Sequence, residues 1–547
     1  MRRGAAVAVL TVLAVLGIAP GRSEGCTNLI ITKGASADGS TFIAYAADSH
    51  ELYGELYLQP GGVFPAGATR DVIDWDSGKF LGRIPQAPRT YWRVGNINEH
   101  QVAIGETTFG GREELAKPEK GALVDYGSLM YIALERARTA REAIQVMTSL
   151  ASEYGYASEG ESFSVADPNE AWILEMIGKG EDAKGVLWVA RRIPDGTISG
   201  HANQSRIRTF PLHDPANCLY APDAISFARA KGWFSGKDEE FSFADTYAPA
   251  DFGSRRFCEA RVWSMFRRAA PSANLAFDAA KGVPAPLPLW IKPDKKLTLA
   301  DAMALMRDHF EGTPLDMTKD VGAGPFACPY RWRPMEWEVD GKKYVHERAI
   351  STQQTGFSFV AQMRSALPDP IGGVLWFGVD DTYTTCYVPI SCGIQAPPHA
   401  FAEGTGDFNS FSWDSAFWTF NFVSNYTYTR WRDMIQDVQK VQREFEGRFT
   451  AGQPDVDRRA LALYKEDPGL AKDYLTKRAA EATAEVVARW QKLGQFLIWK
   501  YLDGNVRDEK GKVTFPRYPD AWYRRIVKDH GPVIEMKKVE GMAADEE

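Results

Sequence analysis

The chain has 547 residues, of which 44% are hydrophobic and 25% are charged, a composition typical of a globular protein that buries a large core. Its net charge of −7 comes from well-mixed acidic and basic residues without a basic stripe, so nucleic acid is not an expected partner. The six cysteines and eight histidines match no metal-binding spacing, and no glycine-rich nucleotide loop is present, so neither a metal nor a cofactor is predicted.

Residues 1–25 have the layout of a secretory signal peptide. Two arginines precede an apolar run from Ala5 to Ile18, and a polar stretch ends with the small residues Ser23 and Gly25 at the positions that a signal peptidase inspects. After Ile18 no apolar run approaches the ~20 residues of a membrane span. We therefore expect an exported protein that is periplasmic, secreted or lumenal and has no membrane span.

Cleavage after Gly25 would make Cys26 the first residue, with a thiol and a free α-amine on one residue. Such an amine has an ordinary pKa of about 7.7 to 8.0, so it can accept the thiol proton near neutral pH. Two other interpretations remain open. Cys26 is a half-cystine or a buried thiol, or it is the acylated cysteine of a lipoprotein, although Ser23 stands where a lipoprotein normally has an apolar residue.

The strand and helix pattern begins with a hairpin directly after Cys26. Residues 28–32 and 41–45 are β-prone and enclose a turn that contains Asp38-Gly39. This hairpin would bring Asp48 opposite Cys26, within a rung or two, and so place a carboxylate beside the candidate nucleophile. The alternative is that Asp48 merely ends a strand.

Further strands and helices alternate along the chain without an internal repeat or a long linker. Strands are predicted at 101–105, 162–166, 171–177, 186–190, 373–378 and 385–389, and helices at 125–138, 139–154, near 298–311, 431–447 and 470–502. Thr139 is a candidate N-cap, and Thr298-Leu-Ala-Asp301 has a capping-box pattern. The sequence therefore predicts an α+β fold with a helical C-terminal part.

A dozen short motifs occur in order between Cys26 and about residue 445. They include Cys26-Thr-Asn, Ile104-Gly-Glu-Thr107, Asp125-Tyr-Gly, Ser162-Phe-Ser-Val-Ala-Asp-Pro-Asn-Glu-Ala-Trp172, His201-Ala-Asn-Gln-Ser-Arg-Ile207, Glu347-Arg with Thr352-Gln-Gln-Thr355, and Ile371-Gly-Gly-Val-Leu-Trp-Phe-Gly378. In these motifs the chain resembles the cysteine-type dipeptidases of the N-terminal-nucleophile hydrolase superfamily, which also include the secernins. The resemblance implies a four-layer αββα sandwich, a hydrolase domain over 26–445 and a helical extension over 446–547 that packs on it.

The resemblance also implies roles for individual residues. Cys26 matches the nucleophile, and Asp48 matches the aspartate that holds its α-amine. Asn203 resembles the asparagine that donates to the oxyanion, and Thr107 falls where relatives place a second oxyanion contributor. Arg261 resembles the arginine that supports the nucleophile electrostatically.

Each of these residues also has a structural interpretation. Asn203 could be a turn residue, Thr107 an ordinary strand threonine, and Arg261 the partner of Glu259 or another carboxylate on a helix surface. Arg256 is a rival for the place of Arg261, and His201 more plausibly orders the loop beside Asn203 than takes part in catalysis.

Tyr45 is the one clear departure from the family pattern. Many members have an arginine three residues before the aspartate, and this chain has Tyr45 there. A cation lowers a thiol pKa and tyrosine does not, so either another arginine substitutes or Tyr45 makes a different substrate contact.

We expect an exported, cofactor-independent cysteine dipeptidase that forms an acyl-enzyme on Cys26 and acts on small peptides, as a monomer or a homo-oligomer. Two alternatives remain: an amidase or acylase of another small N-acyl compound, and a lipid-anchored binding protein that has lost catalysis.

Overall fold

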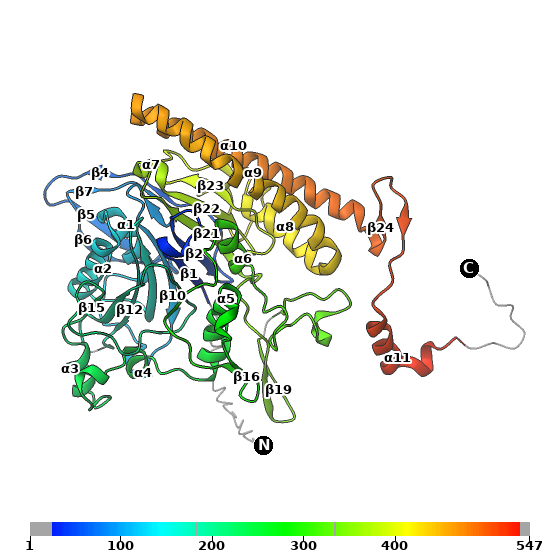
Figure 1. Ribbon diagram of the computed structural model, residues 1–547, viewed down its shortest axis with the longest axis horizontal. Helices are drawn as coiled ribbons and strands as arrows, with labels where there is room; N and C mark the ends of the chain where they lie inside the picture. Colours follow the sequence, from blue (N-terminus) through cyan, green and yellow to red (C-terminus); the bar gives the residue numbers. More distant parts are fainter. Residues whose placement is uncertain (1–24, 182, 333–334, 537–547) are drawn as a thin grey trace, which may run out of the picture.

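The computed structural model describes residues 25–181, 183–332 and 335–536 (Figure 1). Except for Gly25, the predicted signal peptide lies outside the described residues, as does the polar C-terminal segment 537–547. Mixed helices and antiparallel sheets form the body, and a helical region follows at the C-terminal end, so the predicted α+β class is confirmed.

The first sheet has seven strands, and Cys26 directly precedes β1, one of its inner strands. In spatial order these are β18 (Trp290–Ile291), β14 (Ile198–His201), β1 (Thr27–Ile31), β2 (Thr41–Asp48), β21 (Thr355–Met363), β22 (Val374–Val379) and β23 (Val388–Ser391). β1 and β2 form the predicted hairpin, and Thr27 pairs with Ala46 in its register. Both strands are buried along their whole length, so both of their faces are covered.

The second sheet has eight strands and packs on the first. Its order is β15 (Cys218–Tyr220), β13 (Val186–Arg192), β12 (Ala171–Gly178), β11 (Gly160–Ala166), β10 (Ala103–Phe109), β9 (Ile97–Asn98), β8 (Arg93–Val94) and β3 (Leu58–Gln59). β1 and β2 contact β10 and β11, which brings the middle strands of the two sheets together. β9 pairs with β10 only at Ala103, so the edge of β10 from Gly105 onward has no strand partner among the described residues.

Helices cover the outer faces of both sheets. α1 (Tyr126–Arg136) and α2 (Ala140–Tyr154) share a hydrophobic core with the second sheet, and α5 (Ala260–Ala269) and α6 (Leu299–Met306) contact the first. Two predicted caps are confirmed: Thr139 accepts from the Glu142 amide, and Thr298 and Asp301 form a capping box. α6 ends five residues before the predicted limit.

Smaller elements complete the body. The two-stranded ribbons are β4 (Gly62–Val63) with β7 (Arg89–Thr90), β5 (Thr69–Ile73) with β6 (Phe80–Pro85), β16 (Phe277–Asp278) with β17 (Val283–Pro284), and β19 (Glu336–Val339) with β20 (Lys342–Val345). The short helices are α3 (Ala224–Ala230), α4 (Phe243–Tyr247) and α7 (Asp369–Gly372).

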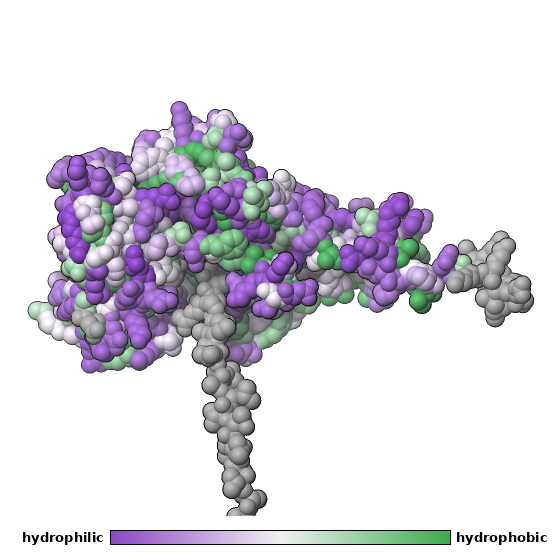
Figure 2. Space-filling model, turned by 90° about the horizontal axis from the view of Figure 1, so that it is seen from below, coloured by the Kyte–Doolittle hydropathy of each residue, from purple (hydrophilic) through white to green (hydrophobic). Residues whose placement is uncertain are grey.

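Three helices form the C-terminal layer: α8 (Ala416–Thr429), α9 (Trp431–Glu466) and α10 (Pro468–Lys500). α9 is longer than predicted and runs through residue 445, so the expected domain boundary falls inside a helix. β24 (Val506–Arg507), β25 (Val513–Thr514) and α11 (Asp520–Ile534) then lead away from the body (Figure 1), and Figure 2 shows a narrow projection with interspersed hydrophilic and hydrophobic residues. No helix in the described ranges has both the length and the apolarity to cross a membrane.

Candidate active site

Cys26 lies directly before β1, where the chain enters the first sheet. Its side chain is only half-buried, although both neighbouring residues are buried. The Sγ atom lies 3.5 Å from the Tyr45 hydroxyl, and that hydroxyl donates a hydrogen bond to the carboxylate of Glu106 on β10. Tyr45 therefore links the thiol to a carboxylate of the second sheet.

Asp48 ends β2 beside Cys26. The Gly25 amide donates to the Asp48 carbonyl oxygen over 3.1 Å. Asp48 therefore lies one rung from the position opposite Cys26, as the hairpin predicted. Its carboxylate accepts from Arg348 Nη2 at 2.9 Å and from Thr355 Oγ1 at 2.6 Å. Burial raises the pKa of Asp48, while the Arg348 charge and these hydrogen bonds partly offset that increase.

Arg261 extends from the first turn of α5, directly after a π-helical turn at Ser254–Glu259. Its guanidinium donates to the Cys26 carbonyl oxygen at 2.7 Å, to Thr27 Oγ1 at 2.8 Å and to Asn203 Oδ1 at 2.8 Å. The side chain is buried, and burial together with the Arg348 charge lowers its pKa to about 10. Arg261 is therefore held against the backbone of the candidate nucleophile.

The contacts of Glu259 and Arg256 bear on the two alternatives to the predicted role of Arg261. Glu259 pairs with Arg206, so it is not the partner of Arg261 on a helix surface. Arg256, the rival candidate, pairs with Glu347 and donates to the Gly282 carbonyl oxygen.

Asn203 and Asn28 cover the unpaired edge of β10. Asn28 Nδ2 donates to the Glu106 carbonyl oxygen and Asn203 Nδ2 to the Thr108 carbonyl oxygen, both over 2.6 Å. Asn203 adopts a left-handed backbone conformation with φ of 57°. Because an amide nitrogen has two hydrogens, Asn203 keeps one for another acceptor while Arg261 fixes its oxygen.

Thr107 and His201 connect the two sheets. His201 Nδ1 lies 2.7 Å from Thr107 Oγ1 and Nε2 lies 2.8 Å from Ser164 Oγ. Burial lowers the pKa of His201 to about 3, which keeps the ring neutral and agrees with an ordering role. The Thr107 hydroxyl thus forms a hydrogen bond with His201. The contribution of Thr107 to an oxyanion site stays a prediction.

The surroundings of Cys26 favour the protonated thiol. Burial raises the pKa of Cys26 well above its ordinary value, and the charges of Glu106 and Asp48 raise it further. The Tyr45 hydroxyl and the Asp48 backbone offset only part of this increase. Because the thiolate is the reactive form, this thiol needs a proton acceptor to act as a nucleophile.

Three residues near Cys26 and Asp48 were not predicted from the sequence: Glu106, Arg348 and Thr355. Arg348 donates both to Asp48 and to the Gly25 carbonyl oxygen, and Thr355 holds the other carboxylate oxygen of Asp48. All three stand inside the motifs Ile104-Gly-Glu-Thr107, Glu347-Arg and Thr352-Gln-Gln-Thr355. Their position inside these family motifs was therefore the sequence feature that could have identified them as site residues.

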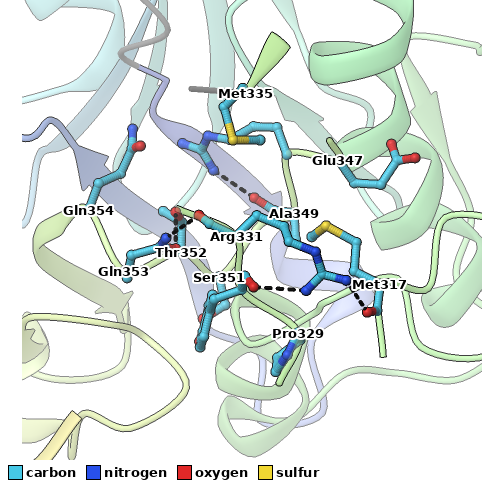
Figure 3. A pocket seen from close by; sticks show the side chains of 12 residues that line it. Met317, Pro329, Arg331, Met335, Glu347, Ala349, Ser351, Thr352, Gln353 and Gln354 are labelled. Carbon is cyan, nitrogen blue, oxygen red and sulfur yellow. Dashed lines mark hydrogen bonds between the residues drawn. The ribbon is translucent and has the colours of Figure 1, made fainter. Parts of the chain in front are cut away.

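The segment that carries Arg348 borders a small cavity of about 20 Å³, lined among others by Arg331, Glu347 and Gln353 (Figure 3). Buried nitrogen or oxygen atoms of Arg331, Glu347 and Arg348 lack partners. A polar space of this size suits one water molecule and is too small for a peptide.

Gly105 lets the two sheets approach at the thiol. A Cβ atom there would lie 2.3 Å from Asn28 Oδ1 and 3.2 Å from Tyr45 Cβ. We expect Gly105→Ala to displace Asn28 and Tyr45, to destabilise the fold by about 1–3 kcal/mol, and to lower kcat/KM about tenfold or more.

Urea unfolding and steady-state hydrolysis would measure both effects. Gly110→Ala is the matched control, because a Cβ at Gly110 meets no atom within 4 Å. Unchanged activity of Gly105→Ala would show that this close approach is not needed at the site.

No group of three histidine, cysteine or acidic residues suited to hold a metal ion occurs among the described residues. All six cysteines lie in the described ranges, and none forms a disulfide.

Comparison with known proteins gave consistent matches over most of the chain. The model of peptidase family C69 matches residues 60–444, a range that includes Thr107, Asn203 and Arg261 and begins after Asp48. A probable dipeptidase of Salmonella dublin is 25% identical over 406 residues, which cover 70% of this chain and 84% of that protein. A probable dipeptidase of Latilactobacillus sakei is 25% identical over 374 residues, which cover 65% of this chain and 71% of that protein. Probable dipeptidase B of Streptococcus pyogenes serotype M1 is 22% identical over 489 residues, which cover 85% of this chain and 91% of that protein.

Proposed function

Because this chain belongs to peptidase family C69 and is therefore a peptidase, we propose that it is a cysteine-type dipeptidase whose nucleophile is Cys26 once that residue has become the N-terminus. One observation carries this proposal: the half-buried thiol has Tyr45, Asp48, Arg261 and Asn203 gathered around it or its backbone. The names of the relatives supply the substrate class.

We also propose that the two packed sheets with helices on their outer faces form the four-layer αββα sandwich of N-terminal-nucleophile hydrolases. The central position of β1, which starts directly after Cys26, supports this assignment. The body would end near residue 445, with the helical extension packed on it.

In the proposed reaction, cleavage of the bond between Gly25 and Cys26 frees an α-amine on Cys26. That amine takes the thiol proton while Sγ attacks the scissile carbonyl carbon, and the carbonyl oxygen becomes an oxyanion. The free N–H of Asn203 is the proposed donor to this oxyanion, with Thr107 as a second contributor. The protonated amine then gives its proton to the departing amino acid, which leaves a thioester on Cys26.

Water completes the cycle by attacking the thioester while the α-amine accepts the water proton, and the thiol is restored when Sγ leaves with that proton. Asp48 would hold the α-amine, since its carbonyl oxygen already accepts from the neighbouring Gly25 amide. Arg348 and Arg261 would supply the positive charge that the missing arginine gives in relatives, because both contact the backbone at Gly25 or Cys26.

We further propose that residues 1–25 direct export and are removed. Intact mass and N-terminal sequencing of the protein from its natural host would test this. A chain that starts at Cys26 with a free amine is the expected result, and a lipid-modified or blocked Cys26 would contradict the mechanism because no α-amine would be available.

The activity itself is tested by incubating the chain that starts at Cys26 with a panel of dipeptides and of small N-acyl amides. We expect hydrolysis of dipeptides, and a thioester adduct on Cys26 in acid-quenched samples. Hydrolysis of the N-acyl amides alone would identify an acylase instead.

A further inference from the structure

Two glutamates lie side by side on the second sheet, close to the thiol. In the register of β10 and β11, Glu106 is opposite Phe163 and Glu161 is opposite Thr108, so the two glutamates are diagonal neighbours on one face of the sheet. Glu106 is 3% exposed and Glu161 is fully buried.

These carboxyl groups lack the partners that other buried carboxylates of this protein have. Glu106 accepts from the Tyr45 hydroxyl, and the groups that act on the pKa of Glu161 through hydrogen bonds are the Glu106 carboxyl and the Thr108 side chain, neither of which is a cation. In contrast, Glu175 on the next strand accepts from Ser205 and from the amides of Arg206 and Ile207. No lysine or arginine of the described ranges pairs with Glu106 or Glu161, so this buried site lacks a cation.

The site is within reach of a substrate bound at Cys26. The Tyr45 hydroxyl contacts both Sγ and the Glu106 carboxylate, so the carboxylate lies within about two hydrogen-bond lengths, or ~6 Å, of the sulfur. In a dipeptide the α-nitrogen is only ~2.5 Å from the scissile carbonyl carbon. These lengths allow an ammonium group next to a carbonyl under attack by Sγ to reach hydrogen-bond distance of Glu106 when the substrate N-terminus points toward Tyr45.

We propose that Glu106 binds the free α-ammonium of the substrate's N-terminal residue. Glu161 lies next to Glu106 on the same face of the sheet, and the Tyr45 hydroxyl lies between the Glu106 carboxylate and the thiol. This inference rests on the proposed dipeptidase function and names the group that selects the substrate. It makes a free amine next to the scissile bond a requirement, which distinguishes a dipeptidase from an amidase of N-acyl compounds.

The charge of the pair fits one ammonium group. Burial and the adjacent Glu106 raise the pKa of Glu161 well above its ordinary value, which disfavours a second negative charge beside Glu106. The pair then presents at most one negative charge, in a buried place where an ionic hydrogen bond is strong.

The test compares Ala-Ala with propionyl-alanine, which lacks only the amine, using the chain that starts at Cys26. The wild-type protein is expected to prefer Ala-Ala by about 100-fold or more. In Glu106→Gln, which keeps an acceptor for the Tyr45 hydroxyl, the ratio of kcat/KM for Ala-Ala to kcat/KM for propionyl-alanine should fall about 10- to 100-fold, because only Ala-Ala carries the ammonium group.

Alkylation of Cys26 by iodoacetamide shows whether the site of Glu106→Gln is intact. Because the Glu106 charge raises the pKa of the thiol, its removal should leave the alkylation rate equal or faster, whereas a collapsed site would slow it. Glu161→Gln resembles the protonated acid and should lower kcat/KM for Ala-Ala less than Glu106→Gln does.

An equal fall for both substrates in Glu106→Gln, or a wild-type protein that does not discriminate between them, would overturn the assignment while leaving the peptidase proposal in place. A larger loss in Glu161→Gln than in Glu106→Gln would overturn the choice of Glu106. Failure of the wild-type protein to cleave any dipeptide would instead refute the proposed function, and this inference with it.

Discussion

Replacing Cys26 with alanine is expected to abolish dipeptide hydrolysis, with a loss on the order of 10⁴-fold or more. The substitution removes the atom that forms the acyl-enzyme, and no other described cysteine contacts Tyr45. The side chain is half-buried, so the fold should remain and the melting temperature should change little. Steady-state hydrolysis together with thermal unfolding would measure both.

Cys328→Ala is the matched control, because Cys328 is also a half-buried free thiol. We expect it to keep wild-type activity. Full activity of Cys26→Ala would exclude the thiol as the nucleophile.

The chain that retains Gly25 is expected to be as inactive as Cys26→Ala. Gly25 lies against the side chains of Asn203 and Arg348, and its peptide bond turns the α-amine of Cys26 into an amide that cannot accept a proton. The raised pKa of the thiol keeps it protonated in this state. If such a chain hydrolysed dipeptides as fast as one that starts at Cys26, the amine would not be the base.

Local sequence patterns were sufficient for the elements nearest to the thiol. The hairpin of β1 and β2 has β-prone runs around an Asp-Gly turn, and its register determines the position of Asp48 relative to Cys26. The helix caps at Thr139 and Thr298 follow from the same short-range chemistry. Such features depend on residues a few positions apart, so the sequence alone reveals them.

The remaining site residues come from distant parts of the chain. Glu106 and Arg348 are 80 and 322 positions from Cys26, and only the packing of one sheet on the other and of a long loop onto β2 brings them near it. No periodic pattern encodes that approach. The length of α9 was underestimated because buried residues become sparse after Phe449, where only Ala460 is fully buried, while the helix continues to Glu466.

Tyr45 stands where the family motif has an arginine, and two arginines from distant parts of the chain lie near the same site. The sequence left open whether another arginine takes the missing place, and the structure has two guanidinium groups at the Gly25–Cys26 backbone. Tyr45 itself contacts the thiol and Glu106, which favours a substrate-side function for it.

Asp48→Asn is expected to lower kcat about 100-fold or more and also to destabilise the fold, by about 3 kcal/mol. Asp48 is 1% exposed and its carboxylate pairs with the buried Arg348, so the neutral amide leaves a buried guanidinium without its counter-charge. Retained activity would exclude Asp48 from the site.

Loss of stability alone would not demonstrate a role in catalysis, and a second buried aspartate that pairs with an arginine separates the two effects. Asp308 is fully buried, accepts from Ser264 at 2.6 Å and pairs with Arg268 at 2.9 Å, yet it makes no contact with the residues around Cys26. Asp308→Asn should therefore also lower the free energy of unfolding, through loss of a buried carboxylate and its contacts, and keep kcat within about threefold of wild type. If both variants lost activity in proportion to their stability, Asp48 would be a structural residue; a loss confined to Asp48→Asn, measured well below both melting temperatures, would assign it to the positioning of the Cys26 amine.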